Sequence, residues 1–508
     1  MKKIVRLLFS RFFIISTIIV AQIAFLSVII SGILQYSSLI YSLVQLAAIV
    51  MVIIIIGNNN NPSYKLAWSI VILIFPLLGV AFYLTSVHTP SSVRFKQKMK
   101  KYLKYHTKLL DHHEHIYEEV PHIDQQYIKT SKFIKNAVGY PIWKNTNSTY
   151  FSTGEAFFAE HTAQLKKAKK FIFLEYFIIE EGVMWNTTLE ILKEKAAEGV
   201  KVYLLYDDLG TINTLPARYD KTLREAGIHV EVFNPFKPKI DLLMNQRDHR
   251  KITVIDGKVG FCGGLNLADE YINVIEKYGH WKDTAVMIEG EAVSSLISMF
   301  LQLWNYTSKN DLAPQQFLNE VSGVKSDGFV QPFADIPKHT WDVSENTYLN
   351  IINRATKYVY ITTPYLIIDH NMMTSLIRAA KSGVDVRIIT PHIPDKKIVF
   401  MTTQSYYRAL VANGIKIYEY TPGFIHAKMI VADDTISVVG TINMDYRSLY
   451  LHFECGILFM HSNVISAVKE DILETMKKCE EMNMDKLKKT PFYTKAIHIV
   501  LRLFAPLM

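Results

Sequence analysis

A motif that occurs twice constrains the fold of this chain more than any other feature of the sequence. It consists of a histidine, a lysine, an aspartate, a glycine and an asparagine, in that order. The first copy comprises His249, Lys251, Asp256, Gly263 and Asn266. The second copy has the same spacing and comprises His426, Lys428, Asp433, Gly440 and Asn443. Because an internal repeat indicates repeated structural units, the chain is predicted to contain one fold twice.

Each copy of the motif predicts a β-hairpin. In the first copy, Ile252–Ile255 is β-branched at every position, as is typical of a buried strand. Asp256 and Gly257 then form a turn signal. A histidine and a lysine two residues apart in an extended segment point to the same face. The histidine, lysine and asparagine should therefore meet at one end of the hairpin, as in a phosphate site that also holds a nucleophile.

These motifs resemble those of the phospholipase D superfamily. Four neighbouring segments are similar to its bacterial cardiolipin synthase branch, namely GHWKD at 279–283, DEY at 269–271, TPY at 363–365 and NMDYRSL at 443–449. The pair Gly263 and Gly264 is also typical of that branch. The resemblance implies an α/β fold: two tandem phospholipase D-like α-β-α sandwich units that form one pseudo-twofold catalytic body, preceded by N-terminal transmembrane helices.

The pattern of helices and strands agrees with two α/β units. Helical spacing at 155–170 and 189–199 alternates with apolar strand-like runs at 171–179 and 200–206. The same alternation returns with helices at 349–356 and 373–382 and strands at 358–362 and 383–390. We therefore expect the first phospholipase D-like unit at 141–325 and the second at 326–508. The first unit has extra residues at 235–245, which we expect to form a loop over the active site.

Residues 1–88 are predicted to be a membrane region. Apolar runs at 12–34, 39–56 and 66–84 each have about the length of a transmembrane helix, ~20 residues. Basic residues between Arg94 and Lys108 favour the cytoplasmic side for themselves and for the units after them. The sequence thus predicts a multi-pass protein of the cell membrane with its catalytic units in the cytoplasm. Three full spans would place the basic N-terminus outside, so one run could instead be re-entrant or interfacial.

Residues 89–140 are predicted to be a basic helical connector. Its segment 111–115 contains Asp, His and Glu side chains, but their crowding favours a solvated helix face over a metal site. The net charge of +9 indicates an anionic partner, either a membrane or a nucleic acid. The cysteines, Cys262, Cys455 and Cys479, have no CxxC spacing and predict neither a disulfide framework nor a zinc site.

The motif residues suit chemistry on a phosphodiester. Lys251 and Lys428 can neutralise the phosphate, and Asn266 and Asn443 can donate hydrogen bonds to its oxygens. One histidine can attack phosphorus while the other protonates the leaving alkoxide and later deprotonates the acceptor. The residues alone do not show which histidine is the nucleophile and which is the acid/base. The family resemblance implies that His249 is the nucleophile and His426 the acid/base.

Acidic residues complete the predicted catalytic set. Asp283 and Glu454 follow the two motif asparagines and are candidates for orienting the histidines, a role that the resemblance also implies. Asp256 and Asp433 belong to the catalytic motif, although their place at hairpin turns favours a structural role. No metal and no cofactor are expected, because the sequence has no evident carboxylate cluster for a cation.

By resemblance, the substrate is phosphatidylglycerol in an anionic membrane. One molecule would give a covalent phosphatidyl-histidine and release glycerol, and a second would accept the phosphatidyl group to give cardiolipin. Three side chains, Tyr365, Phe424 and Tyr446, together with 492–508, could form a lipid-facing rim or be ordinary core and an amphipathic helix. The sequence leaves both interpretations open.

Three other functions are weighed against this one. A membrane-bound phospholipase D of the same fold would hydrolyse phospholipids to phosphatidic acid. A phosphodiesterase or nuclease would explain the basic charge but has no use for three apolar runs, so no nucleic-acid partner is expected. A non-catalytic lipid-binding scaffold would not need both motifs intact, and both are intact.

Overall fold

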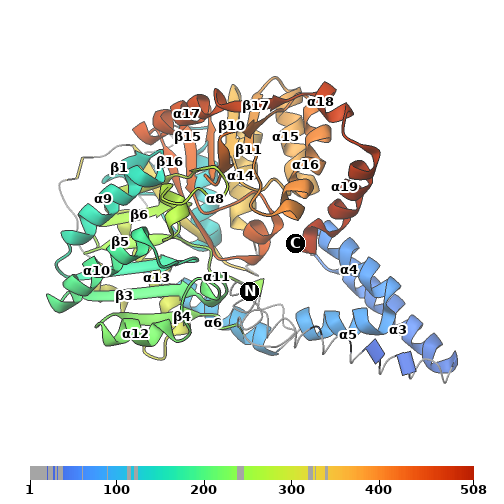
Figure 1. Cartoon of the computed structure of the whole chain (residues 1–508), viewed down its shortest axis with the longest axis horizontal. Coiled ribbons are helices and arrows are strands. Elements are labelled where there is room, and N and C mark those ends of the chain that lie inside the picture. The colour runs from blue at the N-terminus through green and yellow to red at the C-terminus, as the bar shows by residue number, and fades with distance from the viewer. Residues whose placement is uncertain are drawn as a thin grey trace.

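The computed structural model describes residues 38–59, 61–87, 90–110, 116–118, 124–236, 245–318, 324–325, 328–337 and 341–507, with scattered residues between 20 and 32. Two α/β units lie side by side and form the body of the molecule, the first in cyan to yellow-green and the second in orange to red (Figure 1). A group of helices from the N-terminal region, in blue, extends from this body beside the C-terminal helix.

The first unit is built on a seven-stranded sheet with the order β1-β8-β6-β5-β2-β3-β4. Its strands are β1 (Thr146–Phe151), β2 (Phe171–Tyr176), β3 (Lys201–Asp207), β4 (His229–Phe233), β5 (Ile252–Ile255), β6 (Val259–Gly263) and β8 (Ala285–Gly290). Strands β2, β3 and β4 are parallel, and β5, β6, β8 and β1 continue the sheet in antiparallel fashion. The predicted hairpin is β5 and β6, joined at Asp256.

The second unit repeats this order in an eight-stranded sheet, β17-β12-β11-β10-β14-β15-β16-β9. Its strands are β9 (Phe329–Asp335), β10 (Tyr358–Thr362), β11 (Asp385–Pro391), β12 (Lys416–Tyr420), β14 (Met429–Ala432), β15 (Ile436–Gly440), β16 (Glu454–Met460) and β17 (Cys479–Met482). Apart from the extra edge strand β17, each strand has a counterpart in the first sheet. This confirms the predicted mixed α/β architecture with two similar sheets.

Helices cover both sheets. In the first unit they are α9 (Gly154–Lys166), α10 (Val183–Ala197), α11 (Asp208–Thr211), α12 (Tyr219–Glu225) and α13 (Val293–Thr307). In the second unit they are α14 (Val343–Arg354), α15 (His370–Lys381), α16 (Lys397–Val411), α17 (Asn463–Met476), α18 (Met484–Lys488) and α19 (Phe492–Phe504). Several begin at a local cap, such as Asp369, whose carboxylate accepts the Met372 N–H at the start of α15.

The two units are joined by a second kind of strand pairing. β7 (His280–Lys282) of the first unit pairs in parallel with β13 (Gly423–Ile425) of the second. A related bridge joins Asp248 to Phe453. Each junction lies directly before a motif histidine or an acidic residue. The active-site residues are therefore positioned by contacts between the units as well as by their own hairpins.

The N-terminal region differs from the prediction of three spans. No helix among the described residues is long and apolar enough to cross a membrane. The first predicted run, 12–34, lies largely outside the described residues, and the second corresponds to α3 (Ser38–Gly57). The third, 66–84, is wrong as a single helix, because α4 (Pro62–Ile74) ends before Pro76 and α5 (Pro76–Val87) begins there. Proline has no N–H to donate and its ring clashes with the preceding turn, so it breaks the helix.

The connector is helical where it is described. Helix α6 (Pro90–Lys108) carries the basic residues and packs against α13, and α8 (Ile128–Val138) packs against α14 and β9. This contact explains why α13 is buried on nearly every side, although it is a helix of a globular body. Segment 111–115, the candidate metal cluster, and most of the 235–245 insertion lie outside the described residues.

Candidate active site

The motif histidines and lysines directly precede the first strand of each hairpin. His249 and Lys251 lie before β5, which begins at Ile252, and His426 and Lys428 lie before β14. The N–H of His249 donates to the Phe453 carbonyl at 3.0 Å, and the N–H of His426 donates to the Lys282 carbonyl at 2.7 Å. Each histidine is thus anchored on the other unit.

Two acidic residues cross the unit boundary to hold the histidine rings. Nδ1 of His249 lies 2.9 Å from Oε1 of Glu454. Nδ1 of His426 lies 2.6 Å from Oδ2 of Asp283. The carboxyl groups of Asp283 and Glu454 are fully buried. With Nδ1 engaged in both rings, Nε2 of each histidine is the nitrogen left for a substrate.

The two histidine–acid pairs are related by the pseudo-twofold symmetry of the body. Gly263 pairs with Ala285, and Gly440 pairs with Gly456, so Asp283 and Glu454 each stand two residues before an equivalent sheet position. At Gly263 an added Cβ would lie 2.6 Å from the Cα of Ala285. The glycine of each motif therefore permits the close approach of the strand that carries the acidic residue.

The residue after that glycine differs between the units. A Cβ on Gly264 would lie 2.1 Å from Oδ1 of Asp283, so only glycine leaves room for this carboxylate. In the second unit the same position is Thr441, whose hydroxyl hydrogen-bonds Oε2 of Glu454. The first unit therefore accommodates the Asp283 carboxylate beside a glycine, and the second unit stabilises the Glu454 carboxyl group with a hydrogen bond from Thr441.

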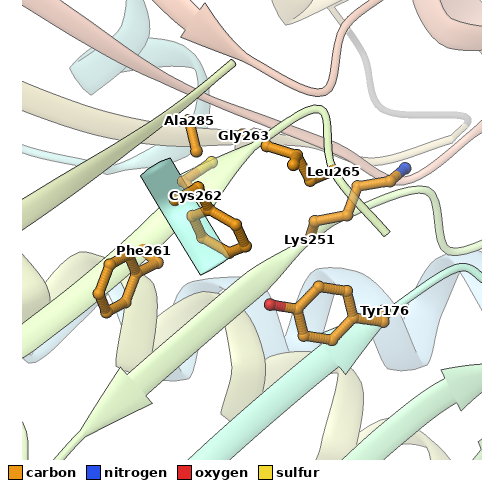
Figure 2. A pocket seen from close by; sticks show the side chains of 8 residues that line it. Tyr176, Lys251, Phe261, Cys262, Gly263, Leu265 and Ala285 are labelled. Atoms are coloured by element: carbon orange, nitrogen blue, oxygen red, sulfur yellow. The ribbon is translucent and has the colours of Figure 1, made fainter. Parts of the chain in front are cut away.

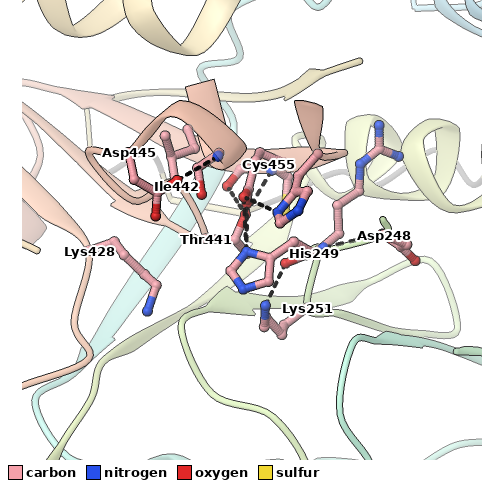
Figure 3. Close-up of polar contacts among 12 residues, drawn as sticks. Asp248, His249, Lys251, Lys428, Thr441, Ile442, Asp445 and Cys455 are labelled. Atoms are coloured by element: carbon pink, nitrogen blue, oxygen red, sulfur yellow. Dashed lines mark hydrogen bonds and ion pairs between the residues drawn. The ribbon is translucent and has the colours of Figure 1, made fainter. Parts of the chain in front are cut away.

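The two lysines place positive charge at the site. Nζ of Lys251 donates to the His249 carbonyl at 2.5 Å, and Nζ of Lys428 donates to the His426 carbonyl. Figure 3 shows both ammonium groups on the same side of the His249 ring. Burial lowers the pKa of Lys251 to about 8, and burial together with repulsion from Lys251 lowers the pKa of Lys428 to about 7. The energetic cost of holding two buried cations together is relieved by an anion.

Packing holds the Lys251 stem. The chain from Cβ to Cε lines a small cavity with Tyr176, Phe261 and Leu265, and its ammonium group points out of this cavity (Figure 2). The Tyr176 hydroxyl bonds to the Thr253 hydroxyl at 2.8 Å, so the polar atom in the cavity wall is satisfied. The residues around this cavity thus fix the direction of the Lys251 side chain.

The two asparagines are buried but differ in their contacts. Oδ1 of Asn266 accepts the Ile178 N–H at 2.9 Å, and its Nδ2 donates to the Tyr271 hydroxyl at 2.6 Å. The side chain of Asn443 hydrogen-bonds the Asp445 carboxyl. Their assignment to phosphate binding stays a prediction, and in the first unit an anion would compete with Tyr271 for the amide.

Asp256 and Asp433 lie at the far end of the hairpins from the histidines, beyond a four-residue strand that is itself about 13 Å long at ~3.3 Å per residue. The Asp256 carboxylate accepts the N–H groups of Lys169, Lys170 and Phe171 at 2.7–3.0 Å. The Asp433 carboxylate accepts the three N–H groups of residues 356–358 at 2.7–3.0 Å. These contacts join each hairpin to the start of the neighbouring strand and favour the structural role, while the place of both residues in the catalytic set stays a prediction.

The two histidine–acid pairs differ electrostatically. Burial, together with the nearby lysine charges, lowers the pKa of His249 well below its usual value, and burial raises that of Glu454. In the other pair burial would raise the pKa of Asp283, but His426 and Lys428 outweigh it and lower the pKa. Burial lowers the pKa of His426 to about 4, against the opposing effect of Asp283. The first pair thus favours an uncharged state, and the second keeps a charged carboxylate beside its imidazole.

One further site residue, His452, was missed in the sequence. Its ring centroid lies 5.6 Å from that of His249, and Nδ1 lies 3.8 Å from Oε1 of Glu454. Neither ring nitrogen has a hydrogen-bond partner in the part of the chain that the structure describes. His452 stands two residues before Glu454, as Trp281 stands before Asp283, and the Trp281 ring lies 5.2 Å from His426. An alignment of the two units in the sequence would have placed His452 opposite Trp281 and so identified it as a site residue.

His249, His452 and Glu454 also bring three potential metal ligands within 4.8 Å of one another. The ammonium groups of Lys251 and Lys428 would repel a cation at this place, so the charge of the site favours an anion. The expectation of a metal-free site remains a prediction, and this charge balance favours it.

The residues weighed for a lipid-facing rim separate into two groups. Phe424 and Tyr446 are 1% and 6% exposed and belong to the core, whereas Tyr365 is half-buried and donates its hydroxyl to Asp395 at 2.6 Å. Helix α19, by contrast, has no buried residue. Of the candidates for the rim, this helix is therefore the exposed one.

Comparison with known proteins gives consistent matches. The family model for the phospholipase D-like domain of cardiolipin synthase matches residues 162–304 and 348–476, and that for the phospholipase D-nuclease N-terminal region matches 46–85. The chain is 45% identical over 444 residues to an uncharacterized protein of Streptococcus mutans, covering 87% of this chain and 96% of that protein. It is 35% identical over 456 residues to a cardiolipin synthase of Alkalihalophilus pseudofirmus, covering 88% of this chain and 90% of that enzyme.

Solved structures give a match at the level of the fold. Phosphatidylserine synthase of Haemophilus influenzae aligns with a TM-score of 0.58 at 15% sequence identity, over 75% of this chain and 97% of that one. At this identity the likeness concerns the arrangement of the two sheets and not the substrate.

Proposed function

The chain belongs to the family of cardiolipin synthases with phospholipase D-like domains, and from that premise we propose that it transfers a phosphatidyl group from one phosphatidylglycerol to another, releasing glycerol. The observation that carries the proposal is the pair of crossed contacts, His249 with Glu454 and His426 with Asp283. A phosphodiester transferase with a covalent intermediate needs two positioned histidines, and both are oriented here by a buried acid.

The first step is attack by His249 on phosphorus. Its lowered pKa keeps the imidazole neutral near pH 7, and its Nδ1–H donates to Glu454, so the lone pair lies on Nε2. The new N–P bond forms as the bond from phosphorus to the glycerol oxygen breaks. Lys251 and Lys428 offset the charge that gathers on the non-bridging oxygens.

His426 supplies and removes the proton. The pKa of His426 is about 4, so without substrate its imidazole is neutral near pH 7. The charged Asp283 at 2.6 Å and the anionic phosphate of the bound substrate both favour its imidazolium form, so His426 takes up a proton from solvent as the substrate binds and gives it to the leaving glycerol. Neutral His426 then takes the proton from a hydroxyl of the second phosphatidylglycerol. That oxygen attacks phosphorus, the N–P bond breaks, and both histidines return to their starting state.

Aromatic side chains near His426 favour transfer over hydrolysis. The rings of Trp281, Tyr271 and Phe424 have centroids 5.2, 5.6 and 5.8 Å from that of His426. An apolar wall here disfavours a free water molecule beside the base, so the acceptor with an attached lipid has the advantage.

We propose that 141–325 and 326–508 act as the two catalytic units, and that 1–88 associates with the membrane while α6 faces the cytoplasmic side through its basic residues. The substrates are then anionic phospholipids at high local concentration.

Lipid product analysis tests the function. The purified protein is incubated with phosphatidylglycerol vesicles, alongside His249→Ala, His426→Ala and the control His229→Ala on the exposed start of β4. Cardiolipin and glycerol in equal amounts, lost in the first two variants and kept in the third, support the transferase. Phosphatidic acid without cardiolipin means a phospholipase, and no turnover of any phospholipid refutes the proposal.

A further inference from the structure

The C-terminal helix α19 turns its polar side toward the protein. Nζ of Lys495 donates to the Lys488 carbonyl at 3.3 Å, and the Arg502 guanidinium lies 4.6 Å from the centre of the Tyr406 ring. His498 is half-buried on the same side. A surface helix normally packs its apolar side on the core and exposes its polar side, so the orientation here is the reverse of the usual one.

The outer side of α19 is apolar. We call its residues the C-terminal apolar stripe: Phe492, Tyr493, Ile497, Ile499, Val500, Leu503 and Phe504. Phe492 is 86% exposed, Ile499 is 73% exposed, and no residue of α19 is buried. An exposed apolar patch of this kind marks a surface that contacts another apolar phase.

This stripe continues toward the N-terminal helices. The 3₁₀ turn Ala505–Leu507 that follows α19 packs against α4, and Figure 1 shows α19 and α4 on the same side of the body. Helices α3 to α5 expose many large apolar side chains as well, including Leu46, Ile53, Leu66, Ile74 and Leu84. The two ends of the chain thus present neighbouring apolar surfaces.

Charge at the stripe favours an anionic partner. Between 484 and 507 the basic residues are Lys486, Lys488, Lys489, Lys495 and Arg502, and the acidic residue is Asp485. An apolar helix face with basic residues beside it fits the interface of a bilayer with anionic headgroups.

We propose that the C-terminal apolar stripe inserts into the surface of an anionic phospholipid bilayer, the same bilayer that α3 to α5 contact. The inference rests on the proposed function for the identity of that bilayer as the substrate source. The body is then held at the membrane from both ends of the chain. The N-terminal helices contact a segment next to the active site, because Nδ2 of Asn61, between α3 and α4, donates to the Tyr450 hydroxyl at 3.1 Å. Tyr450 lies on the π-helical turn Arg447–Leu451 that leads to His452 and Glu454.

Lipid-borne quenching of a fluorescent label tests the contact without any need for turnover. The full chain carries Val500→Cys, and the matched control carries Val183→Cys at the start of α10, where the valine is 52% exposed against 54% for Val500. Both variants also carry Cys479→Ser, which leaves Cys262 and Cys455, both buried, as native cysteines. Each protein is reconstituted into phosphatidylglycerol vesicles that contain brominated acyl chains.

The proposal expects quenching of the label at 500 and none at 183. An equal signal at the two positions overturns it. Protection of the label at 500 from aqueous iodide in detergent, increasing with protein concentration, also overturns it, because a second copy would then cover the stripe.

A kinetic comparison ties the contact to activity. Ile499→Glu combined with Val500→Glu should slow cardiolipin formation on vesicles by about tenfold or more, because the two changes remove apolar surface from the contact and add negative charge that anionic headgroups repel. The rate on detergent-dispersed phosphatidylglycerol and the rates of Val183→Glu should stay unchanged. An equal loss in vesicles and detergent refutes the proposal. A wild-type protein that makes no cardiolipin refutes the proposed function, while the quenching measurement still decides the contact.

Discussion

Replacing Asp283 by asparagine tests the electrostatic difference between the two histidines. The substitution keeps the size of the side chain and a hydrogen-bonding group beside Nδ1 of His426, but it removes the negative charge that stabilises the imidazolium. His426 should then fail as the acid that protonates the leaving glycerol. The matching change Glu454→Gln should cost much less, because the raised pKa of Glu454 already favours its uncharged form and the amide is nearly isosteric.

The expected loss follows from the contact distance. Unit charges 2.6 Å apart at an effective dielectric constant of ~20 attract by about 6 kcal/mol. The cost of keeping the carboxylate buried offsets part of this, which leaves about 4 kcal/mol and a fall in kcat/KM of about a thousandfold for Asp283→Asn. For Glu454→Gln the loss should be about tenfold, the value of one weakened hydrogen bond.

The assay is initial-rate cardiolipin formation from phosphatidylglycerol, followed by mass spectrometry. Asp220→Asn on α12, which removes an exposed ion pair with Arg224, controls for charge loss alone and should leave the rate unchanged. Circular dichroism of each variant checks the fold. Equal losses for Asp283→Asn and Glu454→Gln, or a greater loss for the second, would refute the assignment of His426 as the acid.

Three other perturbations have outcomes that the geometry predicts. Gly264→Ala should lower kcat by about a hundredfold with little change in the urea midpoint, because the new Cβ displaces the Asp283 carboxylate by steric overlap; an active variant would contradict the tight fit. The KM for phosphatidylglycerol should rise by about tenfold between pH 7 and pH 8, because Lys428, with a pKa of about 7, loses the charge that binds phosphate, and more steeply above pH 8, where Lys251, with a pKa of about 8, loses its charge as well; a KM that stays flat from about pH 6 to pH 9 would refute this. Asp433→Ala should lower the free energy of unfolding of the second unit by about 3 kcal/mol, measured by urea denaturation, since it leaves the backbone N–H groups at the start of β10 without their acceptor; unchanged kcat in the folded variant would separate this structural role from a catalytic one.

The repeated motif allowed much of the site to be predicted. Identical spacing in two hairpins placed His249 with Lys251 and His426 with Lys428, and the alternation of helices and strands predicted the tandem α/β units. The rest required contacts between segments far apart in sequence. Nothing local indicates that Glu454 holds the histidine of the other unit, because that pairing arises from the junction of Asp248 with Phe453.

Two other differences between the sequence predictions and the structure have identifiable causes. Hydropathy alone predicted one helix over 66–84, although Pro76 carried the information that the helix must break. His452 was overlooked because it has no histidine counterpart in the first unit, where Trp281 occupies the equivalent position. The reverse orientation of α19 could not be predicted, since an amphipathic sequence shows that two faces exist but not which one meets the protein.

Mass spectrometry of the trapped covalent intermediate tests the proposed mechanism most directly. Wild-type protein is mixed with phosphatidylglycerol, quenched rapidly at alkaline pH, where a phosphorus–nitrogen bond survives, and digested. We expect a phosphatidyl adduct on the peptide that contains His249, with none on the peptide that contains His426. An adduct on His426 would reverse the two roles, and cardiolipin formed without an adduct on either histidine would contradict the covalent mechanism.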